Sequence, residues 1–148
     1  MTGKAQTTNL VVRRAFTASA ERVFDAWLDP ETAGRWLFAT PEGTVTRCEI
    51  DPRVGGGFII SDRRDGEDIE HVGTYEEIDR PRRLVFTLSV PKYSKITARI
   101  IIEIAPAGDG CELTLTQEFT PEIIEFLDSA REGWTSILDA LAQSLGNR

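Results

Sequence analysis

The most informative stretch for the fold is TPEIIEFLDSAREGWTSILDALAQSL, residues 120–145, because it predicts one long amphipathic helix near the C-terminus. Thr120 suits the N-cap position, and Pro121 with Glu122 suits the first turn of a helix. An apolar stripe at helical spacing consists of Trp134, Ile137, Leu138, Leu141 and Leu145. A helix with one apolar stripe must bury that stripe against another layer of the protein.

The layer that this helix covers is predicted upstream, where the apolar residues alternate with a period of two. Strands are predicted at residues 10–16, 45–50, 58–62, 69–78, 83–90, 96–105 and 111–119. The turns between the later strands are short, so these strands should form an antiparallel meander. Tyr75 and Ile78 both look buried although their spacing is odd, which suggests a bulge between them.

Glycines mark positions where the backbone must turn or approach another segment. Gly55-Gly56-Gly57 predicts a bend where the sheet curls, because a phosphate-binding loop would be followed by a helix and by a Lys-Ser or Lys-Thr pair. Gly66 would supply the positive φ of a hairpin turn. Within the long helix, Gly133 predicts a close contact or a kink, and Gly146 predicts the end.

Two short helices are predicted between the first strand and the rest of the sheet. Ser19 is a good N-cap for the first helix, and Asp29-Pro30 separates it from a second helix that ends near Trp36. Helices segregated from an antiparallel sheet define an α+β fold. We expect a flexible N-terminal tail at residues 1–9 and a single domain at residues 10–148.

The composition of the 148 residues restricts the function. The 24 acidic and 17 basic residues give a net charge of −7, which disfavours nucleic acid and anionic membranes as partners. No apolar run reaches the ~18 residues needed for membrane insertion, and the polar N-terminus lacks the pattern of a secretory signal, so we expect a cytoplasmic protein with reduced Cys48 and Cys111. No spacing of ligands suggests a metal, and no cofactor is expected.

A resemblance to a known family rests on several short motifs in a fixed order. They are residues 12–16, 20–27 and 29–31, Trp36, residues 51–56, 73–78, 81–87 and 133–134, Leu138 and Leu141. Together they resemble the small proteins related to the C-terminal domain of the activator of the heat-shock-protein-90 ATPase, within the START-like (SRPBCC, helix-grip) superfamily. The resemblance implies a curved antiparallel sheet wrapped around the long C-terminal helix. It also implies a cavity between them for a small hydrophobic or amphipathic molecule.

Strand alternation combined with this resemblance gives candidate cavity-lining residues. On the strands they are Phe58, Ile60, His71, Tyr75, Phe86, Leu88, Ile100, Ile102, Leu115, Gln117 and Phe119. Outside the strands they are Trp36, Phe38, Tyr93, Trp134 and Ile137. Trp36 would be a lid if it is exposed and would hold the second short helix to the sheet if it is buried. Periodicity does not distinguish a filled core from a lined cavity.

Three functions remain open at this point. The leading hypothesis is a binding protein whose ligand is oriented by Gln117, Tyr75 or His71. An enzyme of the cyclase or hydrolase type is the alternative, with His71, Tyr75 and Asp62 as the acid–base set if they converge in the cavity; otherwise Asp62 belongs to a solvated, charge-rich hairpin. No residue is assigned as catalytic. The third is a chaperone- or stress-related interaction module, and the sequence permits a homodimer without demanding one.

Overall fold

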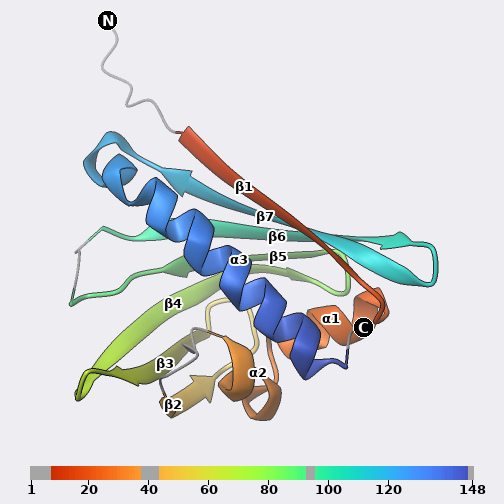
Figure 1. Ribbon diagram of the computed structural model, residues 1–148, viewed down its shortest axis with the longest axis horizontal. Coiled ribbons are helices and arrows are strands. Elements are labelled where there is room, and N and C mark those ends of the chain that lie inside the picture. The colour runs from red at the N-terminus through yellow and green to blue at the C-terminus, as the bar shows by residue number, and fades with distance from the viewer. Residues whose placement is uncertain (1–7, 38–43, 93–95, 147–148) are drawn as a thin grey trace, which may run out of the picture.

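A curved antiparallel sheet of seven strands forms the main layer of the protein (Figure 1). The computed structural model describes residues 8–37, 44–92 and 96–146. The strands are β1 (Thr8–Phe16), β2 (Thr44–Ile50), β3 (Gly57–Arg64), β4 (Glu67–Asp79), β5 (Arg83–Leu88), β6 (Ala98–Ala107) and β7 (Gly110–Phe119). Their order is β1-β7-β6-β5-β4-β3-β2, so consecutive hairpins run from β2 to β7 and β1 pairs with β7 at the edge. The predicted meander is confirmed.

The helices lie on the concave side of this sheet. They are α1 (Ala20–Ala26), α2 (Pro30–Trp36), the 3-10 helix η1 (Pro121–Phe126) and α3 (Leu127–Ser144). The two short helices after β1 are therefore confirmed, and the Ser19 side chain caps α1 by accepting a hydrogen bond from the Arg22 amide at 3.3 Å. The C-terminal helix differs from the prediction, because its first part is the separate turn η1 and the Thr120 side chain makes no capping hydrogen bond.

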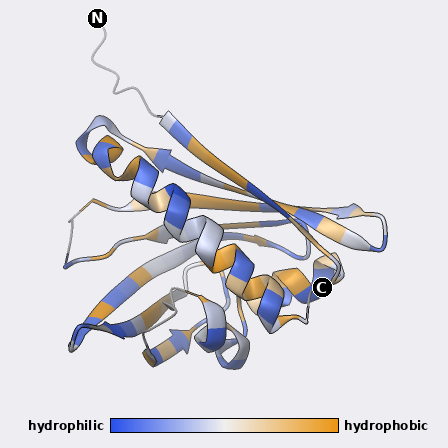
Figure 2. Ribbon diagram, in the orientation of Figure 1, coloured by the Kyte–Doolittle hydropathy of each residue, from blue (hydrophilic) through white to orange (hydrophobic). Residues whose placement is uncertain are grey.

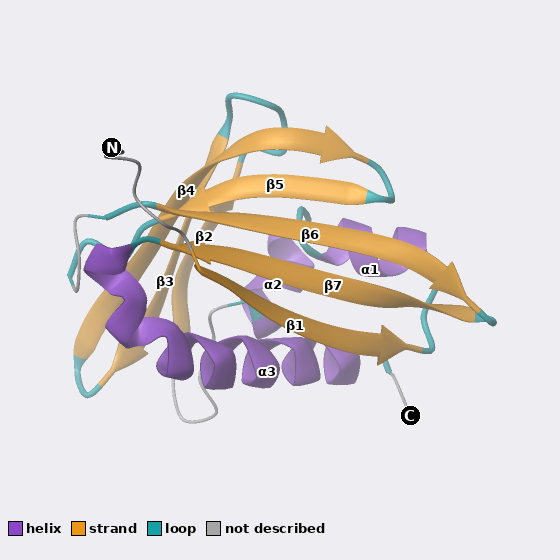
Figure 3. Cartoon of the chain, turned by 90° about the horizontal axis from the view of Figure 1, so that it is seen from above, coloured by secondary structure: helices purple, strands orange, loops and turns teal. Residues whose placement is uncertain are grey.

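The apolar stripe of α3 holds the helix against the sheet. Figure 3 shows α3 running along the strands, and Figure 2 shows apolar residues concentrated on part of its surface. Trp134, Leu138 and Leu141 are buried to 4%, 0% and 0% exposure. At the rim, Arg14 of β1 donates to Asp139 of α3 at 3.0 Å. Since α3 also contacts α2, the helix spans the concave face from the β1 edge toward the elements beside β2.

Strand β4 contains the expected irregularity. Its pairing with β5 shifts between Tyr75 and Glu77, so the predicted bulge is confirmed. Gly73 lies just before the shift, and a Cβ atom there would be only 1.8 Å from the Thr87 carbonyl oxygen. At the other end of β4, Asp65 and Gly66 both have positive φ, as the hairpin turn to β3 requires.

The β6–β7 hairpin is longer than predicted. Pro106 and Ala107 belong to β6, although the sequence suggested that they form part of the loop, and their partners on β7 are Cys111 and Gly110. The strand also begins at Ala98 instead of residue 96. Pairing with β7 extends β6 beyond the segment that alternation alone identifies, whereas its pairing with β5 ends at Glu103.

Gly133 gives a first testable prediction. It is exposed on α3 and nothing lies within 4 Å of the place that its Cβ would take, so the predicted close contact is wrong. We expect Gly133→Ala to raise the free energy of unfolding by about 0.5–1 kcal/mol, because alanine loses less backbone entropy in a helix. Urea denaturation followed by circular dichroism measures the change.

The same substitution at Gly73 is the matched control. Gly73→Ala must push the new methyl group against the Thr87 carbonyl and the Phe58 ring, so its free energy of unfolding should fall. If Gly133→Ala also lowered the free energy of unfolding, α3 would need a glycine at residue 133 for a reason that the exposed helix face does not provide.

Candidate functional site

An apolar hollow of about 410 Å³ lies where η1 and the start of α3 meet the sheet. We call it the mouth pocket. The residues that line it are Leu88, Val90, Ile96, Ala98, Gln117, Phe119, Ile123, Phe126, Ser129 and Ala130. Eight of these side chains are apolar, and none carries a charge. Such a surface excludes most polar solutes and suits a small hydrophobic molecule.

Strand register and the turn into η1 place the two walls of the mouth pocket. Ala98 of β6 pairs with Leu88 of β5, and Gln117 of β7 pairs with the next inward residue of β6, Ile100. Phe119 is the last residue of β7, so the chain turns immediately after the sheet wall and η1 crosses over it. Consequently η1 supplies the opposite wall within a few residues.

Gln117 is the buried polar residue of the mouth pocket, with 8% of its surface exposed. The indole Nε1 of Trp134 donates a hydrogen bond to its Oε1 atom at 2.7 Å. Trp134 itself is 4% exposed and does not line the pocket. The amide therefore stands at the boundary between the mouth pocket and the packed interior, with its orientation set from the interior side.

The interior behind Gln117 is filled by six aromatic side chains, the aromatic cluster: Trp27, Trp36, Phe58, Tyr75, Phe86 and Trp134. The ring centroids of Trp27 and Trp36 are 4.7 Å apart in an edge-on arrangement, and those of Phe58 and Phe86 are 5.5 Å apart. Trp36 is fully buried, so it holds α2 in place and is not a lid. These contacts close the deep end of the space between sheet and helices.

The predicted cavity-lining residues separate into groups. Leu88, Gln117 and Phe119 line the mouth pocket. Trp36, Phe58, Tyr75, Phe86 and Trp134 belong to the aromatic cluster. The buried core contains Ile60, Ile100, Ile102 and Leu115, while Ile137 is half-buried on α3. His71 is buried beside Asp62, and Phe38 and Tyr93 lie outside the described residues.

Sequence reasoning missed much of the mouth pocket. The missed residues are Val90, Ile96, Ala98, Ile123, Phe126, Ser129 and Ala130. Part of the pattern that identifies them was present in the sequence, because Ile96 and Ala98 alternate in step with Ile100 and Ile102 and so belong to the same face. The spacing of three between Ile123 and Phe126 also matches one turn of a 3-10 helix.

His71 and Asp62 come together on the inner side of the β3–β4 hairpin. Their Nδ1 and Oδ1 atoms are 3.9 Å apart, and Nδ1 also lies 3.2 Å from the Ile60 carbonyl oxygen. Asp62 is fully buried, so its assignment to a solvated hairpin is wrong: β3 continues to Arg64 and carries Asp62 on the inner face. Tyr75 packs in the aromatic cluster, where burial raises the pKa of its phenol and keeps it protonated near neutral pH.

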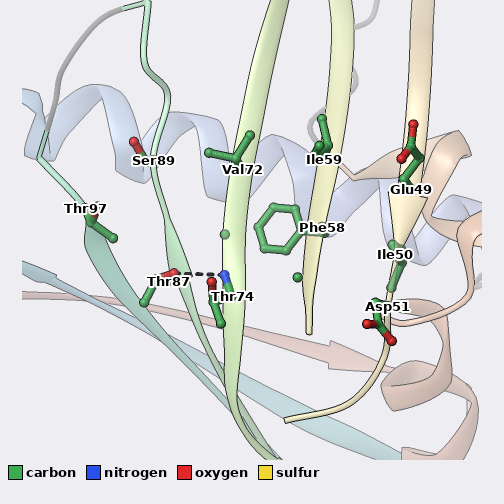
Figure 4. Close-up of a pocket in the computed structure, with 12 residues that line it drawn as sticks. Glu49, Ile50, Asp51, Phe58, Ile59, Val72, Thr74, Thr87, Ser89 and Thr97 are labelled. Atoms are coloured by element: carbon green, nitrogen blue, oxygen red, sulfur yellow. Dashed lines mark hydrogen bonds between the residues drawn. The ribbon is translucent and has the colours of Figure 1, made fainter. Parts of the chain in front are cut away.

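A second hollow, of about 620 Å³, lies on the outer face of the sheet (Figure 4). Its polar lining consists of Glu49, Asp51, Thr74, Thr87, Ser89 and Thr97. The carboxylates are already paired: Asp51 accepts from Arg53 at 2.9 Å, and the hydrogen bond from Arg47 lowers the pKa of Glu49. The Thr87 hydroxyl accepts from the Thr74 amide at 2.9 Å. This outer hollow is open and polar, unlike the mouth pocket.

Further properties concern metals, thiols and membranes. In residues 8–37, 44–92 and 96–146, no group of three His, Cys, Asp or Glu residues is arranged to hold a metal ion. Cys48 and Cys111 are free thiols, and burial raises the pKa of both. Over the same ranges, none of the helices combines the length and the apolar character that crossing a bilayer requires.

Comparison with known proteins identifies relatives of the whole chain. The family model described as "Activator of Hsp90 ATPase homolog 1-like protein" matches residues 17–146. A crystal structure of a Chromobacterium violaceum protein is similar, with 25% identity, a TM-score of 0.82 and coverage of 91% of this chain and 94% of that chain. A Staphylococcus aureus protein of unknown function has 17% identity, a TM-score of 0.83 and coverage of 97% and 96%.

A solution structure of an AHSA1-like protein from Aeromonas hydrophila is also similar, with 20% identity, a TM-score of 0.81 and coverage of 94% of this chain and 92% of that chain. No functionally curated protein matches the sequence. These structures share the curved sheet and the long C-terminal helix over nearly their full length, so the predicted helix-grip fold is confirmed.

Proposed function

Because this chain belongs to the family of activator of Hsp90 ATPase homolog 1-like proteins, we propose that it binds a small apolar or amphipathic molecule in the mouth pocket. The observation that carries the proposal is the pocket itself: about 410 Å³, apolar over most of its lining, with the polar end of one side chain, Gln117, at its inner boundary. Burying the apolar surface of a ligand there supplies about 25 cal/mol per Å².

The entrance to the mouth pocket supports the same proposal. Phe126 lines the pocket and remains 42% exposed, and Ile124 on the same 3-10 helix is also 42% exposed. Large apolar side chains at a pocket rim lose water contact when a ligand binds. The short helix η1 thus offers additional apolar area to a ligand that extends out of the hollow.

The exposed apolar side chains favour a small ligand over a chaperone-type protein partner. Within the described ranges, the large exposed ones are Val11, Val54, Ile124 and Phe126. Two of them flank the mouth pocket, while Val11 lies on β1 and Val54 lies in the turn after β2. A protein-binding surface normally needs a contiguous apolar patch, and two single valines do not form one.

The test is a titration with Prodan, an uncharged naphthyl ketone whose fluorescence shifts to the blue in apolar surroundings. Binding should give a saturable blue shift. A ligand at about 100 times its Kd should also add about 2.7 kcal/mol to the free energy of unfolding, which a thermal-shift assay detects. A small, neutral library of lipids and aromatic compounds extends the measurement. If neither Prodan nor any library member binds, the proposed ligand-binding function is wrong and a protein partner becomes the better hypothesis.

A further inference from the structure

We infer that the mouth pocket selects a ligand with an uncharged hydrogen-bond acceptor, such as a ketone or ester carbonyl, over a carboxylate, and that Nε2 of Gln117 recognises this acceptor. The inference rests on the proposed function and goes further, because it names the chemistry of the ligand and the protein atom that donates a hydrogen bond to it. Its basis is the geometry of one amide group between an indole and an apolar hollow.

Trp134 determines which end of the Gln117 amide faces the mouth pocket. An indole N–H is a donor only, so the atom 2.7 Å from Trp134 Nε1 must be an acceptor, the amide oxygen Oε1. Rotating the amide by half a turn would place an NH₂ group against the indole N–H and bring two donors together. The amide oxygen is therefore held on the interior side, and the two donors of Nε2 point away from Trp134.

Within the described ranges, the hydrogen bond from Trp134 is the one hydrogen bond of the Gln117 side chain, and it uses Oε1, so no described group accepts from Nε2. Gln117 is 8% exposed, and its neighbours in the pocket are apolar except Ser129, which lies on the exposed side of α3. A donor at such a place is satisfied only by water or by a ligand. A ligand that replaces the water with a carbonyl oxygen keeps the hydrogen bond, whereas a hydrocarbon ligand leaves the donor unsatisfied.

The charges around the mouth pocket disfavour an anionic ligand. No lining residue is cationic, so a carboxylate would be desolvated with a neutral amide as its hydrogen-bond donor. Among the neighbouring residues, η1 carries Glu122 and Glu125, and α3 begins with Asp128 in its first turn; all three are exposed acids. They outnumber Arg131, the one basic residue of η1 and α3, and therefore repel an anion that approaches this end of the helix. An uncharged acceptor avoids both costs.

The experiment compares two ligands that differ by one carbonyl group, 1-tetralone and tetralin, by their displacement of Prodan. The unaltered protein should bind 1-tetralone about fivefold more tightly, the contribution of one neutral hydrogen bond. In Gln117→Met, which keeps the length of the side chain, the ratio of the two affinities should fall to about one, with tetralin binding retained. Gln143→Met, the same substitution on an exposed part of α3, should keep the original ratio.

A second variant separates the donor from the shape of the side chain. Gln117→Glu still offers an oxygen to Trp134, but its other oxygen becomes acceptor-only when the carboxyl ionises, so the preference for 1-tetralone should disappear as the pH rises through the pKa of that group. The carboxylate analogue 1,2,3,4-tetrahydro-1-naphthoate should bind the unaltered protein more weakly than tetralin.

The outcomes distinguish failure of this inference from failure of the proposed ligand-binding function. Equal affinities for 1-tetralone and tetralin in the unaltered protein, or an unchanged ratio in Gln117→Met, would overturn the role of Gln117 while leaving a ligand-binding pocket in place. Tighter binding of the carboxylate would overturn the selection for an uncharged acceptor. If Prodan and both tetralin compounds fail to bind, the proposed function is wrong and the inference falls with it.

Discussion

Replacing Trp27 by alanine is expected to lower the free energy of unfolding by about 3–5 kcal/mol. The indole of Trp27 is 1% exposed and stands at the centre of the aromatic cluster, 4.7 Å from the ring of Trp36, 6.1 Å from Phe86 and 6.4 Å from Trp134. Its removal would leave a cavity that joins α1, α2, α3 and the sheet. Because small domains are stable by only about 5–15 kcal/mol, this loss is a large share of the total.

Guanidinium denaturation followed by far-UV circular dichroism measures the effect of Trp27→Ala. Two variants serve as controls. Val11→Ala removes a side chain that is 38% exposed on β1 and should cost about 0.5 kcal/mol or less. Trp27→Phe should cost less than Trp27→Ala, since it keeps most of the ring and removes an indole N–H that has no hydrogen-bond partner in the described structure. A loss below ~1 kcal/mol for Trp27→Ala would show that the cluster is not packed as a core.

Filling the mouth pocket should abolish ligand binding. Ala130 lies on α3, is half-buried and lines the hollow, so the indole of Ala130→Trp would occupy the space that a ligand needs. We expect the affinity for Prodan to fall by about a hundredfold or more, because the ligand would have to displace a buried side chain that costs about 2–3 kcal/mol to expose. The free energy of unfolding should change little, since the helix keeps its packed stripe.

Fluorescence titration of Prodan measures this loss, and Ser136→Trp is the matched control. Ser136 is exposed on the same helix and does not line the mouth pocket, so the same added indole should leave the affinity for Prodan unchanged. Equal affinities for Ala130→Trp and the unaltered protein would mean that Prodan binds elsewhere. Weakening of both variants to the same degree would point to a general effect of the added tryptophan.

His71 and Asp62 lie close together, but they do not support the alternative hypothesis of a cyclase- or hydrolase-type enzyme acting in the mouth pocket. The two side chains meet inside the β3–β4 hairpin, as an acid–base pair requires, but the residues that line the mouth pocket and the outer hollow do not include them. Tyr75 stays protonated in its buried position. A substrate in the mouth pocket would therefore meet Gln117 first, which favours recognition over acid–base chemistry at that site.

The helices and strands and the fold class could be predicted from the amino-acid sequence. Alternation placed the strands to within a few residues, Ser19 and Asp29-Pro30 marked the starts of the short helices, and the stripe from Trp134 to Leu145 identified the covering helix. These signals are local, because the spacing of apolar residues within a strand or helix shows whether the period is two or about 3.6 residues. Turn glycines such as Gly66 follow the same logic, since one residue must adopt the positive φ.

Which buried faces are filled and which remain hollow depends on tertiary packing and could not be predicted from the sequence. Alternation put Phe86 and Leu88 on the same face of β5, yet Phe86 packs in the aromatic cluster while Leu88 lines the mouth pocket. The difference arises because Trp27, Phe58 and Tyr75, which come from distant parts of the chain, pack against the ring of Phe86. Leu88 instead faces the hollow that η1 and the start of α3 enclose. The orientation of the Gln117 amide has the same origin: it depends on Trp134, seventeen residues away in the chain, and no periodicity along β7 contains that information.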